Sequence, residues 1–161
     1  HAHGLPLMAF DSLQVQAHAV NHEGDWDVII PVMDARRDEV YTASFISEKN
    51  TLAFADATRS VILEPQQELT DLFPVLSQSG DSRRVCVIGD AAEKTQRLLG
   101  DRMPECSFVA DFPHAKHMHQ LALCAFSMSK FEDLAYFEPR YLKEFQAGAP
   151  RDPLGLRKQK I

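Results

Sequence analysis

The sequence has few cysteines, few glycines and no long apolar run. Three cysteines among 161 residues, Cys86, Cys106 and Cys124, provide neither a disulfide framework nor a paired zinc motif, so we expect reduced thiols. The seven glycines include no phosphate-binding loop. No apolar run reaches the roughly 18 residues of a membrane helix, which predicts a soluble, cytoplasmic protein without membrane contact.

Positive charge is also scarce. The chain has 17 Lys and Arg residues against 23 Asp and Glu residues, which gives a formal net charge of -6. Binding to nucleic acid through its phosphates needs a clustered excess of cations, so we expect no direct nucleic-acid contact. The composition that is present, 45% hydrophobic and 25% charged, is typical of one globular domain.

The first half of the chain predicts a helix, an antiparallel meander and a second helix. Asp11 is placed to cap the first helix, in which Leu13, Ala17 and Val20 share a face. A second helix is expected over residues 66–76, opened by a proline. Between these helices the expected strands are residues 26–33, 40–46, 51–54 and 59–63.

The second half alternates strands and helices. "RRVCVIGD" predicts a buried strand, "AAEKTQRLLG" a helix with a glycine stop, and "CSFVAD" the next strand. Pro113 is expected to begin the longest helix, and "EDLAYFEPRYLKEF" to extend over the surface of the core. That long helix has an apolar stripe formed by Met118, Leu121, Ala122, Ala125 and Met128.

This order of elements predicts an α/β fold. A mixed sheet with an antiparallel meander followed by parallel strands would be flanked by helices. It is the ribonuclease-H-like arrangement used in each half of the sugar kinase, actin and Hsp70 superfamily.

The histidines are the first candidate ligands for a metal. His18 and His22 are spaced i, i+4, but no glutamate follows the first of them as in HExxH. His114, His117 and His119 begin a predicted helix, where only the first two can share a face. Solvated surface residues are the better interpretation of both groups, and the sequence predicts no metal site.

Catalytic and anion-binding motifs are equally sparse. There is no nucleophile elbow, and no cysteine has basic neighbours that would lower its thiol pKa. Gly89 and Asp90 before a helix could present backbone N–H groups to an anion. We favour the simpler interpretation that they turn a strand into a helix.

A charged corner, "DARRDE", separates the first two expected strands. Arg36 or Arg37 could pair with Asp34, Asp38 or Glu39, an exposed arrangement worth only about 0–1 kcal/mol. Alternatively, the two guanidiniums could dock carboxylates of a partner with bidentate geometry. Composition does not decide between the two.

Three stretches carry a resemblance to a known family. "VMDARRDEVYTASF" resembles the opening of the second domain in the YeaZ or TsaB family of bacterial tRNA threonylcarbamoyladenosine biosynthesis proteins. "HGLPLMAFDSLQVQA" is similar to the family's segment before the interdomain helix, and "EPRYLKEF" to its C-terminal motif. The likeness runs from Gly4 to about Phe145. The matching residues of the C-terminal motif are Pro139, Tyr141, Leu142 and Lys143.

The resemblance implies a division of the chain. The family's N-terminal half has no counterpart here, so the chain looks like a C-terminal domain. We expect residues 1–24 to be an interdomain helix region left from a missing N-terminal domain, and residues 25–147 to form the ribonuclease-H-like domain. Residues 148–161 are expected to form a flexible tail.

The resemblance also implies a role without catalysis. TsaD-like relatives transfer a threonylcarbamoyl group to an adenosine of tRNA, and use a histidine pair for a metal where this chain has Ser12 and Gln16. A glycine-rich phosphate loop of those relatives corresponds to residues 34–39 here, where the glycines are absent. We therefore expect no catalytic residue, metal or cofactor. The corner is expected to serve structure or partner contact through Arg36, Arg37, Glu39 and Tyr41.

The expected function is that of a scaffold subunit in tRNA threonylcarbamoylation. Its partners would be a TsaD-like protein and a TsaE-like ATPase. Apolar surface left by the missing half would favour a homodimer. The alternatives are a glycoprotease-like metallopeptidase and a nucleotide-binding module.

Overall fold

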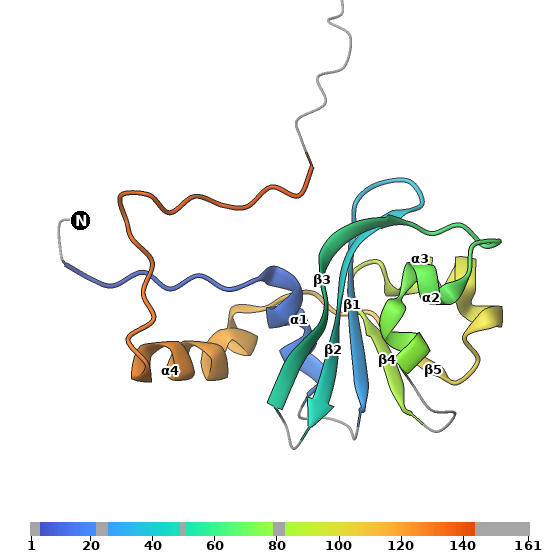
Figure 1. Ribbon diagram of the computed structural model, residues 1–161, viewed down its shortest axis with the longest axis horizontal. Coiled ribbons are helices and arrows are strands. Elements are labelled where there is room, and N and C mark those ends of the chain that lie inside the picture. The colour runs from blue at the N-terminus through green and yellow to red at the C-terminus, as the bar shows by residue number, and fades with distance from the viewer. Residues whose placement is uncertain (1–3, 22–25, 49–50, 79–82, 144–161) are drawn as a thin grey trace, which may run out of the picture.

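The computed structural model describes residues 4–21, 26–48, 51–78 and 83–143. They form a mixed α/β fold around a five-stranded sheet with helices on both faces (Figure 1). The order of the strands in the sheet is β3-β2-β1-β4-β5. Their bounds are β1 Val28–Asp34, β2 Glu39–Glu48, β3 Thr51–Ile62, β4 Val85–Ile88 and β5 Cys106–Val109.

The sheet combines two kinds of pairing. β1 pairs antiparallel with β2, and β2 pairs antiparallel with β3. On the other side of β1, β4 and then β5 are added in parallel. The predicted meander followed by parallel strands is therefore confirmed.

Two layers of helices enclose the sheet. In Figure 1, α1 lies on one side of it, and α2 and α3 lie on the other. The α-helices are α1 Ser12–Val20, α2 Leu69–Leu72, α3 Ala92–Leu99 and α4 His119–Ser127. The 3-10 helices are η1 Pro74–Gln78, η2 Gly100–Arg102 and η3 Ala115–Met118.

Alternate residues of the central strand β1 enter two separate cores. Ile29 packs with Phe45 of β2 and with the apolar face of α1. Its neighbours Val28 and Ile30 pack on the opposite face, in the core that includes Phe73. A strand buried on both faces must be apolar at nearly every position, which explains the apolar run at residues 28–33.

α1 begins where the sequence predicts. The carboxylate of Asp11 accepts hydrogen bonds from the backbone N–H groups of Leu13 at 2.8 Å and Gln14 at 3.4 Å. These donors have no partner inside the helix, so the cap satisfies them. Leu13, Ala17 and Val20 are all buried, which confirms the predicted face.

The third and fourth predicted strands are one strand. β3 runs without a break from Thr51 to Ile62, and Asp56, which lies between the two predicted segments, pairs with Ser44 of β2. A register shift between Thr42 and Phe45 of β2 accommodates the extra length. The prediction of two separate segments was wrong.

The predicted helix over residues 66–76 was also wrong. Its span contains only the short helix α2 and, after a break, the 3-10 helix η1. Pro74 causes the break because the residue before a proline is disfavoured in the helical region, and Phe73 has φ -135 and ψ 84.

The expected longest helix is shorter than predicted. η3 precedes α4, which at nine residues is no longer than α1. Only Ala125 of α4 is buried, and Figure 1 shows that α4 stands away from the sheet. Of the predicted apolar stripe, Ala125 is buried, Met118, Leu121 and Ala122 are half-buried, and 57% of Met128 is exposed.

From residue 130 to Lys143, the last described residue, the chain forms no helix and no extended strand, and residues 134–136 form a turn, so the prediction of a continuously extended segment was only partly right. The expected tail at residues 148–161 lies outside the described residues. No helix of the described segments has both the length and the apolar composition needed to span a membrane.

The cysteines are free thiols in three different environments. Cys86 is buried in β4, Cys106 is half-buried in β5 and Cys124 is exposed on α4. Burial raises the pKa of Cys86 to about 12 and that of Cys106 to about 11.

Gly89 joins β4 to α3 at a position that only glycine can occupy. Its φ is +146, and a Cβ atom there would lie 1.9 Å from the carbonyl oxygen of Val32 in β1. The interpretation of Gly89 and Asp90 as a strand-to-helix turn fits this geometry. The glycine also lets the turn approach β1 closely.

We predict that Gly89→Ala lowers the free energy of unfolding by about 2–3 kcal/mol, because the new methyl group meets backbone and the φ angle is strained. Gly100→Ala is the matched control, since Gly100 has φ -57 and its Cβ would meet only the Gln96 side chain. Urea unfolding measures the free energy of unfolding of both variants. Equal unfolding midpoints for the two variants would contradict the close approach.

Candidate functional site

The corner between β1 and β2 is a tight turn with unfavourable backbone geometry. Arg36 has φ 73 and Arg37 has φ 52, both in the left-handed region. This region costs a residue with a side chain about 1–2 kcal/mol relative to the right-handed one. Because two consecutive residues adopt this conformation, the turn needs stabilising contacts from other parts of the chain.

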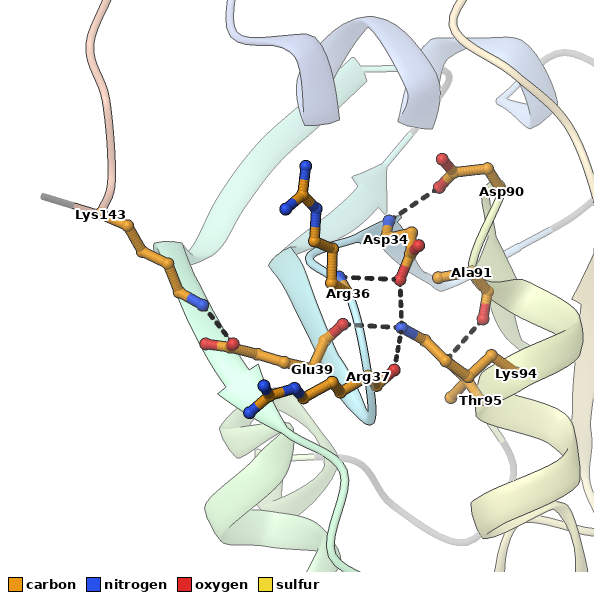
Figure 2. Close-up of polar contacts among 9 residues, drawn as sticks. All are labelled: Asp34, Arg36, Arg37, Glu39, Asp90, Ala91, Lys94, Thr95 and Lys143. Carbon is orange, nitrogen blue, oxygen red and sulfur yellow. Dashed lines mark hydrogen bonds and ion pairs between the residues drawn. The ribbon is translucent and has the colours of Figure 1, made fainter. Parts of the chain in front are cut away.

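Lys94 of α3 supplies that support (Figure 2). Its Nζ donates to the carbonyl oxygens of Arg37 at 2.9 Å and Glu39 at 2.7 Å. It also forms an ion pair and hydrogen bond with the Asp34 carboxylate. We call these three contacts the Lys94 clamp. The Lys94 side chain is only 14% exposed, so water competes little for them.

The Asp34 carboxylate is bound by donors of the turn and of α3. Its Oδ1 accepts from Lys94 and, at 3.1 Å, from the backbone N–H of Arg36. The hydrogen bond from Lys94 holds the pKa of Asp34 below its usual value. The backbone N–H of Asp34 in turn donates to Asp90 at 3.0 Å, which ties the turn to the β4–α3 junction.

The side chains of Arg36 and Arg37 do not contribute to the contacts that stabilise the turn. Both residues are exposed, and neither guanidinium forms a hydrogen bond or ion pair with any residue in the described ranges. Figure 2 shows both pointing away from Lys94. The turn therefore presents two cations to the surroundings.

Glu39, at the start of β2, is the centre of a second cluster. Its carboxylate accepts from the hydroxyl of Ser60 and pairs with Lys143. The Lys143 ammonium also lies 5.8 Å from the centre of the Tyr41 ring, within cation–π range. The contact with Lys143, followed by that with Ser60, holds the pKa of Glu39 below its usual value.

The structure thus brings together the two predicted groups of site residues. Glu39 and Tyr41 from the corner meet Lys143 from the C-terminal motif, 104 residues away from Glu39 in sequence. Whether these residues bind a partner stays a prediction.

A pocket of about 610 Å³ lies beside this cluster. Its lining includes Met33 and Tyr41, the start of α1 and residues 137–142. At its edge, Asp11 accepts from Thr58 at 2.9 Å and lies 3.7 Å from Arg140. The other residues of the C-terminal motif, Pro139, Tyr141 and Leu142, line the same pocket.

The histidines that the structure describes do not form a ligand set for a metal. The rings of His114 and His117 are 5.6 Å apart, and His114 lies 3.7 Å from Asp111. Within the described segments, no group of three or more His, Cys, Asp or Glu side chains is placed to hold a metal ion. His22 lies outside those segments, so its pairing with His18 stays untested.

Ser12 and Gln16 occupy the positions where the resemblance places a metal-binding histidine pair. Ser12 is exposed at the start of α1 and lines the pocket. Gln16 is fully buried, and its amide donates to the carbonyl oxygen of Asp111 at 3.2 Å. Gln16 thus links α1 to the segment after β5.

Sequence reasoning missed the residues that hold the site together. Lys94 is an ordinary helical lysine in the sequence, and its acceptors lie 55 to 60 residues earlier. Thr58 and Arg140 likewise meet Asp11 only in the folded chain. The one usable signal was the Gly89–Asp90 pair, which marks the junction that carries Lys94.

Comparison with known proteins gives a fold but no sequence family. No family model and no curated protein matches the chain. A solved structure of an uncharacterized Pseudomonas aeruginosa protein with similarity to peptidase YeaZ matches with a TM-score of 0.64 and 20% identity, over 86% of this chain and 59% of that chain. YeaZ from Pseudomonas aeruginosa matches with a TM-score of 0.60 and 20% identity, over 85% of this chain and 59% of that chain.

The fold is therefore similar to that of YeaZ structures. The chain spans 59% of the length of each of these two proteins.

We predict that Lys94→Met lowers the free energy of unfolding by about 2 kcal/mol, because two carbonyls and a carboxylate lose a charged donor while the apolar stem remains. Arg97→Met on the same helix is the control, since Arg97 is exposed. Chemical unfolding measures the difference. A Lys94 variant as stable as the Arg97 variant would disprove the clamp.

The ion pair between Asp34 and Lys94 also predicts that the free energy of unfolding depends on pH. Because the pKa of Asp34 is lowered in the folded state, its contribution to stability is present above the unfolded value of 3.8 and is lost as the pH falls through the folded value. The stability gap between wild type and Lys94→Met should narrow below a pH of about 4. A gap that stays constant as the pH falls further would show that Asp34 does not contribute.

Proposed function

We propose that this chain is part of a TsaB-like, YeaZ-type accessory protein that supports a TsaD-like enzyme in tRNA threonylcarbamoylation. The observation that carries the proposal is the fold similarity to two YeaZ structures over 85% or more of this chain. The corner and the C-terminal motif, through which the sequence resembles that family, also meet in space at Glu39 and Lys143.

The finer fold class belongs to the same proposal. An antiparallel β1–β2–β3 meander extended by parallel β4 and β5 is the strand order of a ribonuclease-H-like domain. We infer this class for residues 25–147 and assign residues 1–24 to an interdomain helix region.

A role without nucleotide chemistry is supported by Asp34. A phosphate at this turn would need the Arg36 backbone N–H and the Lys94 ammonium as donors, and the Asp34 carboxylate already accepts from both. A second anion beside it would be repelled. The chain would then act by binding, with the two exposed arginines as the contact for carboxylates of the partner.

The first test is reconstitution. The protein that contains this chain, added to a TsaD-like enzyme and a TsaE-like ATPase, should raise the yield of threonylcarbamoylated tRNA above that of the two partners alone. No increase would contradict the proposal. ATP binding by the chain with micromolar affinity in calorimetry would instead favour a nucleotide-binding module. Stoichiometric metal and peptide cleavage, both lost in His114→Ala and His117→Ala variants, would favour a metallopeptidase.

The second test separates binding from stability. We predict that the double variant Arg36→Gly, Arg37→Gly is at least as stable as wild type, because glycine adopts the left-handed conformation without strain. Its affinity for the TsaD-like partner should fall at least about tenfold, since a charge-assisted hydrogen bond contributes about 1.5–3 kcal/mol. Calorimetric titration measures the affinity and urea unfolding the stability. An unchanged affinity would show that Arg36 and Arg37 do not contact the partner.

A further inference from the structure

Two carboxylates at and beside the pocket are oriented by the domain itself. The Asp11 carboxylate accepts from two backbone N–H groups at the start of α1 and, at 2.9 Å, from the hydroxyl of Thr58. The Glu39 carboxylate accepts from the hydroxyl of Ser60 in β3, and only 21% of the Glu39 side chain is exposed. Both carboxylates are therefore held in position by neutral donors. Together with the Tyr41 ring, which lines the pocket, they form what we call the acidic site.

The acidic site is occupied by two cations of the chain's own C-terminal motif. Arg140 lies 3.7 Å from Asp11. Lys143, three residues later, pairs with Glu39 and lies 5.8 Å from the centre of the Tyr41 ring. Figure 2 shows the Lys143 side chain directed at the Glu39 carboxylate. A carboxylate beside a ring face suits a cation, so the site accepts two positive charges three residues apart on one peptide segment.

Residues 137–143, which we call the strap, fit this site incompletely. The separation of 3.7 Å between Arg140 and Asp11 is longer than a hydrogen bond, and 70% of the Arg140 side chain is exposed. The strap also leaves open the pocket of about 610 Å³, whose lining includes the apolar side chain of Met33. A ligand that fills this volume and brings its guanidinium closer to Asp11 would bind better than the strap does.

The strap is held weakly enough to be displaced. It contains no helix and no strand, and no backbone–backbone hydrogen bond joins residues 138–143 to another described residue. Its ion pairs are partly exposed to water, where such pairs stabilise little. Ordering the strap costs conformational entropy at every residue, so a competing segment has only a small free energy of binding to overcome.

We propose that the acidic site binds a basic, non-helical segment of a partner protein, and that the strap occupies the site when the partner is absent. The segment carries Arg and Lys with two apolar residues between them, because Tyr141 and Leu142 of the strap line the pocket. The tethered strap competes at an effective concentration on the order of millimolar, so the partner must displace it. The proposal does not rest on the role in tRNA modification.

The test measures binding of the capped, fluorescein-labelled peptide GPRYLKG, with GPEYLEG as the charge-reversed control peptide. Wild type is compared with the double variant Arg140→Ala, Lys143→Ala, which we call the released chain because its strap has lost both cations. The released chain should bind the probe at least about fivefold more tightly, since wild type presents a free site in only a fraction of its copies. Fluorescence anisotropy measures both affinities. The control peptide should bind the released chain at least about tenfold more weakly than the probe.

Further substitutions in the released chain assign the binding to the acidic site. Glu39→Gln removes one charge and should weaken binding of the probe about tenfold. Glu64→Gln is the matched control, because Glu64 is exposed and lies outside the site, and it should leave the affinity unchanged. Tyr41→Phe keeps the ring face and should also bind as the released chain does, whereas Tyr41→Ala should bind more weakly. Urea unfolding midpoints check that each variant is folded.

Four results would overturn the proposal. The first is equal or absent binding of the probe and the control peptide, which would show that the two cations are not recognised. The second is equal affinity of wild type and the released chain, because the strap would then not occupy the binding site. The third is binding that Glu39→Gln leaves intact, which would place the site elsewhere. The last is binding that occurs only as a self-associated form of the chain dissociates in light scattering, because the occupant would then be a second copy.

Discussion

The ammonium of Lys94 has three N–H donors and three acceptors around it, and the architecture of the β1–β2 corner depends on this match. Two of the acceptors are backbone carbonyls of a turn that is unfavourable by itself. The third is the carboxylate at the end of β1. A single side chain from α3 therefore fixes the path by which the antiparallel half of the sheet leaves its central strand.

Lys94 can reach the turn only because α3 begins close to β1. Gly89 lets the chain pass against the carbonyl of Val32, and Asp90 then binds the backbone N–H of Asp34. These contacts place the first turn of α3 beside the corner. The missing side chain at Gly89, the hydrogen bond at Asp90 and the clamp at Lys94 thus form one continuous connection between the parallel and antiparallel parts of the sheet.

The elements that the sequence predicts well are those with a local cause. Leu13, Ala17 and Val20 indicate a buried helix face, and the apolar run at 28–33 indicates a strand covered on both sides. The wrong predictions of helices and strands arise where a single proline or the pairing with a neighbouring strand overrides the local sequence pattern. Pro74 divides a helix whose apolar spacing looked continuous, and the pairing with β2 carries β3 through residues with no strand signal of their own.

The candidate site was only partly predictable for a different reason. Glu39, Tyr41 and Lys143 belong to recognisable motifs, but their meeting depends on a chain path that brings together residues 104 positions apart. Lys94 belongs to no motif. Its role depends on the two backbone carbonyl oxygens that accept from it. Every residue has such a carbonyl, so the sequence does not show which of them Lys94 will bind.

The three thiols differ enough in environment to be told apart by chemistry. Cys86 and Cys106 keep their protons at neutral pH because burial raises their pKa values, while Cys124 lies exposed on α4. A maleimide reagent attacks accessible thiolates, so it should modify the helix before the sheet. A fluorophore or spin label could thus be attached to the outlying helix of the natural chain without removing any cysteine.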